Sequence, residues 1–140
     1  QKRFVIQNHG DLVPGHVHRA SHVQTGVGGK GQDVAITLNC LGAKGIRLVQ
    51  LVGRGAEGDL VHDLLQEQLG TEAIATTTVR VQSSMRTCTS IVGGTETTEL
   101  VEPSGTIQPN ELQALLQSCD ALQGKASGIC IMGSMPPGCT

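Results

Sequence analysis

The feature that most constrains the fold is an alternation of apolar strands with amphipathic helices. The run Ile46 to Val52 (IRLVQLV), rich in branched residues, lies between helical patterns over residues 32–41 and 57–69. A second strand is predicted over residues 74–81. Strands separated by a helix pair in parallel, because the helix provides the crossover that a parallel pair needs. The sequence therefore predicts an α/β unit with parallel core strands.

The same pattern continues towards the C-terminal end. Pro109 opens a third predicted helix, whose apolar stripe consists of Leu112, Leu115, Leu116, Cys119 and Leu122. An apolar run over residues 127–133 (SGICIMG) predicts another strand. Gly42 and Gly70 stand where the first two helices should end, since glycine is the common C-terminal stop.

Polar, threonine-rich segments form a second group. Strands are predicted over residues 2–7 and 17–25, and over residues 86–92 and 95–101 on either side of Gly93-Gly94, which is a hairpin signal. Such strands do not suit a buried parallel core. We expect them to form a small antiparallel layer with one face in water.

Composition excludes several classes of function. The net charge is −2 and no basic run is present, which argues against a nucleic-acid partner. No apolar run approaches the roughly 20 residues that span a bilayer, and no signal peptide is visible, so we expect no membrane association. The five cysteines are dispersed, without CxxC pairs, which predicts reduced thiols, no metal site and a cytoplasmic location.

Other features suggest that the chain is a partial unit. Phe4 is the only aromatic residue, whereas a compact domain normally uses several as core anchors. The chain also begins at Gln1 rather than at a methionine, so we expect the true start to lie upstream.

Two segments match G-x-G-x-x-G, at Gly26 to Gly31 and at Gly53 to Gly58. The second stands between a predicted strand and helix, as a dinucleotide site requires. However, no acidic residue occurs between Ala73 and Thr95, where the ribose-binding carboxylate would be expected. A dinucleotide-binding oxidoreductase therefore remains a minor alternative, and no P-loop is present.

The densest chemical signal is the run Gly28-Gly29-Lys30-Gly31, followed by Asp33. Small residues at a helix start let backbone N–H groups approach an anionic or polyhydroxyl ligand. The Asp33 side chain would face the same space as an acceptor. A tight strand-to-helix turn without a ligand explains the same residues equally well.

At this point the sequence resembles a known family. The run Gly-Gly-Lys-Gly-x-x-Val-Ala at residues 28–35, Leu41-Gly42-Ala43 and Gly58-Asp59 are similar to the first signature of the PfkB (ribokinase-like) carbohydrate kinases. Gly133-Ser-Met-Pro-Pro-Gly138 resembles a loop of the same family. The motifs Arg86-Thr-Cys-Thr and residues 98–103 resemble the branch of 1-phosphofructokinase and tagatose-6-phosphate kinase.

The resemblance covers essentially all 140 residues and implies the N-terminal half of such a kinase. The implied fold is α/β and ribokinase-like: a parallel-core sheet flanked by helices, with a small antiparallel β lid. The lid would comprise residues 2–25 and 86–101, and the core residues 28–81 and 109–140. Lid strands of the family often form dimer contacts, which implies a possible homodimer.

The resemblance also implies an activity, the ATP- and Mg-dependent phosphorylation of a sugar or sugar phosphate. In such kinases the glycine pair and the residue at Asp33 line the sugar pocket, and Arg86 matches an arginine that holds a substrate phosphate. Lys30 would be a second cation, Glu102 an acidic residue near the hairpin end, and Ser134 a residue at the pocket edge. The implied substrate-binding set is Gly28, Gly29, Lys30, Gly31, Asp33, Arg86, Glu102 and Ser134.

Two departures from the family pattern matter. Asp33 stands where the family usually has Asn, so its charge would repel a phosphorylated substrate unless Lys30 or Arg86 offsets it. The Gly-Ala-Gly-Asp motif that supplies the catalytic base is absent. We therefore expect no catalytic residue in this chain, ATP and Mg bound mainly by the missing C-terminal half, and no activity from these 140 residues alone.

The alternatives stay open. One is a non-catalytic sugar-binding or regulatory fragment, and a less likely one is a nucleoside kinase of the same superfamily. An isolated arginine such as Arg86 is also commonly a solvated surface charge, Glu102 could simply cap a turn, and Ser134 could be bonded to backbone.

Overall fold

The computed structural model describes residues 1–139, and the side chains of all of these except His9 and residues 69–73. The elements are β1 (Lys2–Ile6), a short 3-10 helix η1 (Gln7–His9), β2 (Ala20–Thr25), α1 (Lys30–Cys40), β3 (Ile46–Arg54), α2 (Ala56–Ala73), β4 (Ile74–Ser84), β5 (Cys88–Val92), β6 (Thr97–Val101) and α3 (Pro109–Asp120). They form two compact units. The sheet unit contains residues 1–27 and 86–103, and the α/β unit contains residues 28–85 and the chain from Ser104 onward.

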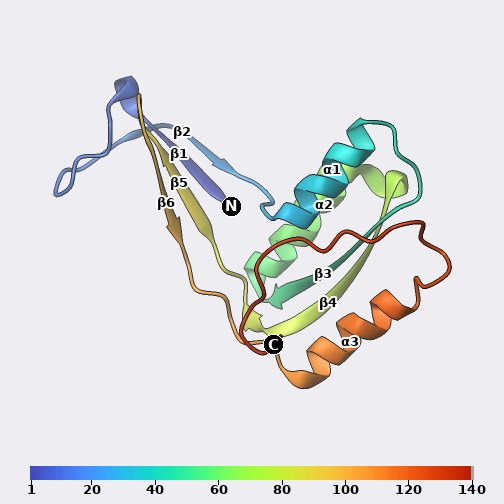
Figure 1. Ribbon diagram of the computed structural model, residues 1–140. Helices are drawn as coiled ribbons and strands as arrows, with labels where there is room; N and C mark the ends of the chain where they lie inside the picture. Colours follow the sequence, from blue (N-terminus) through green and yellow to red (C-terminus); the bar gives the residue numbers. More distant parts are fainter. Residues whose placement is uncertain (140) are drawn as a thin grey trace. The chain divides into compact units, whose positions relative to one another are not determined.

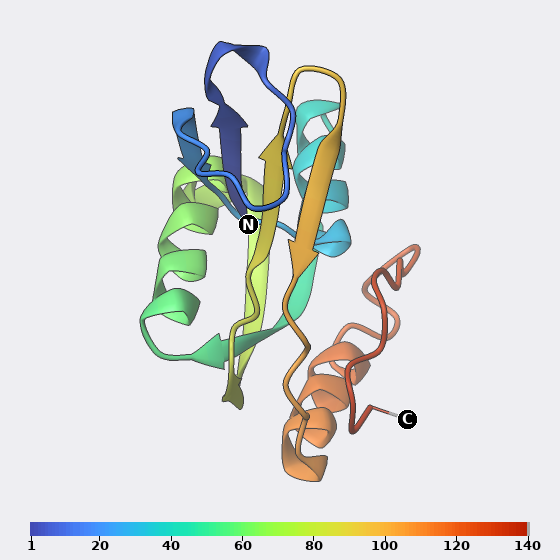
Figure 2. The ribbon, with the colours of Figure 1, turned by 90° about the vertical axis from the view of Figure 1, so that its left-hand side faces the viewer.

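The sheet unit is a four-stranded sheet in the order β2-β1-β5-β6 (Figure 2). β1 pairs antiparallel with β2, and β5 pairs antiparallel with β6, as expected for hairpins. The expectation of an all-antiparallel layer was wrong, however, because β1 and β5 run parallel. These two strands are far apart in the sequence, so no local turn determines their relative direction.

A polar contact fixes the loop between β1 and β2 within the sheet unit. The carboxylate of Asp11 accepts hydrogen bonds from the backbone N–H of Thr95 (2.9 Å) and from its hydroxyl (2.7 Å). The N–H of Glu96 donates to the same carboxylate at 3.3 Å. These bonds lower the pKa of Asp11, chiefly through the Thr95 N–H. The loop is therefore tied to the β5–β6 turn, and β2 begins at Ala20 rather than at the predicted residue 17.

The α/β unit contains the predicted parallel pair. β3 and β4 run parallel in a register that places Ile46 opposite Ile74. Helices α1 and α2 lie on one side of this pair and α3 lies on the other (Figure 1). Its buried apolar side chains are Ala35, Leu48, Val52, Leu65, Ile74, Val81 and Ile107. The expected parallel core flanked by helices is confirmed.

Helix ends follow their local signals only in part. α1 ends at Cys40, and Gly42 follows with φ of 82° while its N–H donates to the carbonyl of Asn39, as predicted for a glycine stop. α2 instead continues to Ala73, past its predicted end at residue 69. α3 begins at Pro109, as expected, because proline lacks the N–H that a helix start leaves unpaired.

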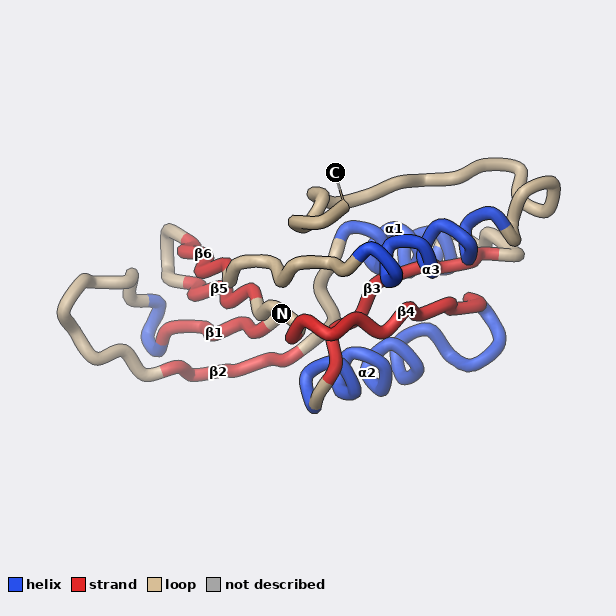
Figure 3. The backbone as a smooth tube through the Cα atoms, turned by 90° about the horizontal axis from the view of Figure 1, so that it is seen from below, coloured by secondary structure: helices blue, strands red, loops and turns tan. Residues whose placement is uncertain are grey.

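The strand predicted over residues 127–133 is wrong. The segment is a loop (Figure 3), with Ile129 68% and Ile131 88% exposed. An apolar run becomes a strand only when a neighbouring strand satisfies its backbone groups. Among the described residues, no other segment pairs with it.

Candidate functional site

The first glycine-rich turn starts helix α1. Gly29 is the residue before the helix and has φ of 148°, a conformation that residues with a Cβ rarely adopt. No side chain caps the helix here, and the first α-helical bond runs from the N–H of Asp33 to the carbonyl of Gly29 at 2.9 Å. The earlier N–H groups of a helix have no partner inside it. The turn therefore offers backbone donors to a ligand.

The side chains at this turn are accessible. Gly28, Gly29, Lys30 and Asp33 are all exposed. Asp33 lies in the first turn of α1, where the helix dipole favours a negative charge. Its charge is therefore compatible with the local structure, and a cation and a carboxylate can both reach a ligand at the turn.

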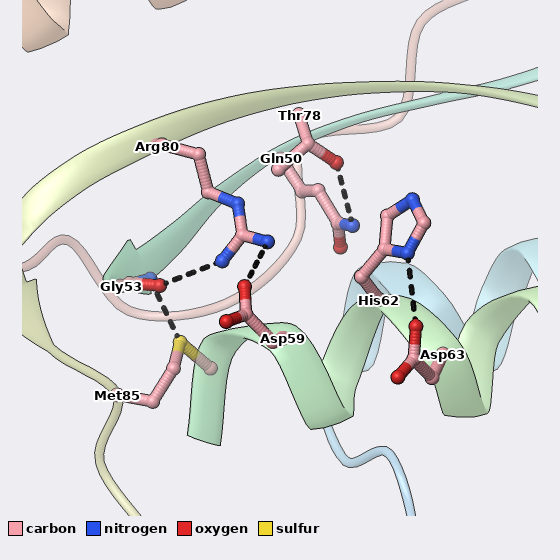
Figure 4. Close-up of polar contacts among 8 residues, drawn as sticks. All are labelled: Gln50, Gly53, Asp59, His62, Asp63, Thr78, Arg80 and Met85. Carbon is pink, nitrogen blue, oxygen red and sulfur yellow. Dashed lines mark hydrogen bonds and ion pairs between the residues drawn. The ribbon is translucent and has the colours of Figure 1, made fainter. Parts of the chain in front are cut away.

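The second glycine-rich turn is filled by the protein's own groups (Figure 4). The guanidinium of Arg80 donates to the carbonyl of Gly53 (3.1 Å) and to the carboxylate of Asp59 (2.7 Å). The N–H of Gly53 donates to Met85 Sδ at 3.0 Å, and a Cβ on Gly58 would collide with the carbonyl of Gly53. These glycines permit close packing of α2 on the end of β3, which gives the second G-x-G-x-x-G motif a structural role.

Arg86 and Glu102 lie in the sheet unit. The carboxylate of Glu102 accepts a hydrogen bond from the N–H of Thr87 (2.7 Å), and the N–H of Glu102 donates to the carbonyl of Thr87 (3.2 Å). Glu102 therefore joins the chain before β5 to the chain after β6. Arg86 is exposed and directly precedes Thr87, so this junction fixes the backbone beside the arginine.

Ser134 is exposed on the loop after residue 133. The following prolines are held in place, since the carbonyl of Pro137 accepts a hydrogen bond from the N–H of Ile107 at 2.8 Å. A Cβ on Gly138 would collide with the carbonyl of Ile107, which explains the glycine at that position. The loop is thus anchored at its C-terminal side. Six of the eight candidate residues, the five at the first glycine-rich turn and Ser134, therefore lie in the α/β unit. Arg86 and Glu102 lie in the sheet unit.

A polar network behind the first turn was not predicted from the sequence. Gln32 Nε2 donates to Gln50 Oε1 at 2.7 Å, and Gln50 Nε2 donates to Thr78 Oγ1 at 3.2 Å. Gln50 is only 7% exposed and lies on β3 between the buried residues Leu48 and Val52. The available signal was a glutamine in the middle of the apolar run IRLVQLV.

Among the described side chains, which leave out His9 and those of residues 69–73, no three His, Cys, Asp or Glu residues are grouped so that they could hold a metal ion. These side chains therefore contain no site that would hold a metal ion through protein ligands alone. No helix in the described part of the chain is long and apolar enough to cross a bilayer.

Solved structures of other proteins share the fold of this chain. No protein-family model matches the sequence. Among solved structures, the chain is similar to a possible 1-phosphofructokinase from Thermotoga maritima, with a TM-score of 0.85 and 25% identity over 98% of this chain and 42% of that one. It is also similar to phosphofructokinase-2 from Escherichia coli in complex with substrates and products (TM-score 0.80, 22% identity, 98% and 42% covered).

A more distant similarity connects the chain to ribokinase from Thermotoga maritima, with a TM-score of 0.54 and 22% identity over 73% of this chain and 32% of that one. The chain spans less than half the length of each of these proteins. It therefore has the ribokinase-like α/β fold of the N-terminal part of PfkB-family carbohydrate kinases.

Proposed function

We propose that this chain provides the sugar-binding part of an ATP-dependent sugar-phosphate kinase most like 1-phosphofructokinase. The observation that carries the proposal is the structural match over 98% of the chain to a possible 1-phosphofructokinase. An exposed, uncapped helix start at residues 28–33 supports it. Bound ATP would supply the phosphoryl group, and we place its site in polypeptide outside these 140 residues.

In this proposal the glycine-rich turn binds the sugar. The N–H groups at the start of α1 donate to sugar oxygens, and the carboxylate of Asp33 accepts from sugar hydroxyls. A substrate phosphate near this carboxylate needs positive charge to offset the repulsion. Lys30, three residues before Asp33, is exposed and is the nearest cation along the chain.

Arg86 is proposed to hold the substrate phosphate. A guanidinium binds phosphate oxygens through two parallel hydrogen bonds, which a lysine cannot do. The bonds between Glu102 and Thr87 keep the backbone beside Arg86 fixed. We therefore assign Glu102 a positioning role, and Ser134 a place at the pocket edge on the anchored loop.

The test is Arg86→Ala in the complete kinase, assayed with fructose 6-phosphate. Because hydrogen bonds to charged groups contribute roughly 1.5–3 kcal/mol, KM should rise about tenfold or more. Arg47→Ala, which removes an exposed arginine at the start of β3, is the matched control and should leave KM unchanged. An unchanged KM in Arg86→Ala would mean that this arginine does not hold the phosphate.

A second candidate is a sugar-binding or regulatory fragment that transfers no phosphate. Its support is the exposed, uncapped start of α1, which offers backbone donors to a ligand without any contribution from an ATP site. Such a chain would bind a sugar phosphate without consuming ATP. Calorimetric titration of the complete natural protein with fructose 6-phosphate, together with an ATP-consumption assay on the same protein, distinguishes this candidate from a kinase, which consumes ATP, and from a nucleoside kinase, which would prefer a nucleoside.

The proposed kinase is a homodimer with a cytoplasmic location. β2 and β6 are the edge strands of the sheet unit, and an edge strand can pair with a second copy, so we propose a homodimer through these strands. Phosphofructokinase-2 from Escherichia coli has been solved in a tetrameric inhibited form. A cytoplasmic location is supported by the five cysteines, which form no disulfide.

A further inference from the structure

The network behind the first glycine-rich turn reaches the turn directly. Gln32 stands in the first turn of α1, between Gly31 and Asp33. Its amide is folded over Gly29, since a Cβ added there would collide with Gln32 Oε1. The Gln32 side chain therefore occupies the space that any larger residue at Gly29 would need, and it lies against the backbone of the turn.

The other end of the network is buried. Gln50 places a primary amide among apolar side chains of β3, where an amide without hydrogen bonds is costly. Its oxygen accepts a hydrogen bond from Gln32. Its nitrogen donates to Thr78, which lies opposite it on β4 (Figure 4). Each bond fixes the orientation of the next amide, because an amide has one accepting and one donating end.

This arrangement favours one side-chain conformation of Gln32, in which its amide points inward to Gln50. If the Gln32 side chain swung out to solvent, Gln50 Oε1 would lose its donor inside the protein, at the cost of an unsatisfied buried acceptor. Gln50 thus holds Gln32 inward. A leucine at position 50 would fit among Leu48 and Val52 but could not hold it.

We propose that Gln50, aligned by Thr78, is a positioning residue for the sugar-binding turn and acts through Gln32. The network holds the Gln32 amide against Gly29 and so keeps the turn and the first N–H groups of α1 in one conformation for a polyhydroxyl ligand. This inference rests on the proposed function of the turn at residues 28–33.

The experiment compares Gln50→Leu with Gln117→Leu, which replaces an exposed glutamine on α3. Two quantities are measured on the folded chain: hydrogen exchange of the Asp33 amide, whose N–H donates to the carbonyl of Gly29, and the Kd for fructose 6-phosphate by calorimetric titration. Gln50→Leu should speed exchange and raise Kd, each about tenfold, since a buried hydrogen bond left unmade costs about that factor or more. Gln117→Leu should change neither.

A double-mutant cycle tests the route of the effect. In a Gln32→Ala background, Gln50→Leu should have no further effect on Kd, because the side chain through which it acts is gone. Thr78→Val should raise Kd, as Gln50→Leu does. Thr78→Ser keeps the hydroxyl and should leave Kd close to that of the unmodified chain. Additive effects in the cycle would overturn the proposal.

The failures of the two proposals are distinguishable. If the unmodified chain binds fructose 6-phosphate and Gln50→Leu binds it equally well, the positioning role is wrong while the sugar site stands. If the unmodified chain does not bind this sugar phosphate, that ligand assignment fails. Hydrogen exchange then decides the positioning role alone: unchanged exchange of the Asp33 amide in Gln50→Leu would overturn it, and faster exchange would support it.

Discussion

The two units of this chain differ in how the backbone hydrogen-bonding groups of their strands are paired. In the sheet unit all four strands are paired, and Asp11 ties the loop after β1 to the β5–β6 turn. The α/β unit has one pair of parallel strands, and its apolar residues Ile129, Ile131 and Met135 remain exposed. Hairpins let a short chain complete an antiparallel sheet from neighbouring segments, whereas parallel strands each need a partner brought in by a long crossover.

The source of stability differs in the same way. Of the buried apolar side chains, all but Ile6 lie in the α/β unit of the described structure. In the sheet unit the buried Ser90 donates to Glu99 at 3.1 Å and accepts from Gln1 at 3.3 Å. Apolar packing should therefore dominate in the α/β unit, and polar contacts should matter relatively more in the sheet unit.

The largest expected effect is in the apolar core of the α/β unit. Leu65 is 2% exposed on α2, and Leu65→Ala should lower the free energy of unfolding by about 3 kcal/mol through lost burial and a cavity. Leu60, on the same helix, is 45% exposed, so Leu60→Ala should cost less than about 1 kcal/mol. Urea unfolding measures both. Equal losses would mean that Leu65 is not in a packed core.

A buried carboxylate gives the next largest effect. Glu111 accepts hydrogen bonds from the N–H groups of Gln82 (2.6 Å) and Gln108 (2.8 Å) and is buried. Glu111→Ala leaves both donors without this acceptor, so the free energy of unfolding should fall by about 2 kcal/mol. Glu67→Ala, at an exposed position of α2, should change it by less than about 0.5 kcal/mol. An equally small loss in Glu111→Ala would contradict the capping role.

The smallest effect is local to the sheet unit and depends on pH. The pKa of Asp11 is lowered by the N–H and hydroxyl of Thr95, so its contribution is present above the ordinary aspartate pKa of about 3.9 and is lost as pH falls through the lower folded value. Asp11→Asn should speed hydrogen exchange of the Thr95 and Glu96 amides near neutral pH. It should also remove the acid-dependent opening of this turn.

The control for this prediction is Asp63→Asn, an exposed carboxyl on α2 that contacts only its neighbour His62 among the described side chains. It should leave exchange at Thr95 and Glu96 unchanged. If the hydrogen-exchange rates of these two amides are the same in Asp11→Asn as in Asp63→Asn, Asp11 does not hold the turn. The sheet unit is then stabilised in some other way.

Local patterns in the sequence were sufficient for most elements. The β3–β4 parallel pair, the β5–β6 hairpin and the start of α3 at Pro109 were predicted because each depends on nearby residues. The parallel pairing of β1 with β5 was not, since it joins distant segments. The predicted strand at residues 127–133 failed because a strand requires a partner that local composition does not reveal.

In the candidate site, too, the features that depend on neighbouring residues were predicted and those that depend on distant residues were not. The helix start at residues 28–33 was visible as a run of small residues, but the roles of these residues, Arg86, Glu102 and Ser134 in binding remain predictions. The Gln32–Gln50–Thr78 network escaped notice because it depends on side-chain positions across three elements. A lone glutamine in an apolar strand was its only trace in the sequence.

The central claim is that this chain supplies a sugar-binding part and that phosphoryl transfer needs polypeptide outside it. The most direct measurement is ATP-dependent phosphorylation of fructose 6-phosphate by the purified 140-residue chain, with binding of the sugar phosphate measured in parallel. The account predicts binding without transfer. Turnover that Arg86→Ala abolishes, from these 140 residues alone, would contradict it.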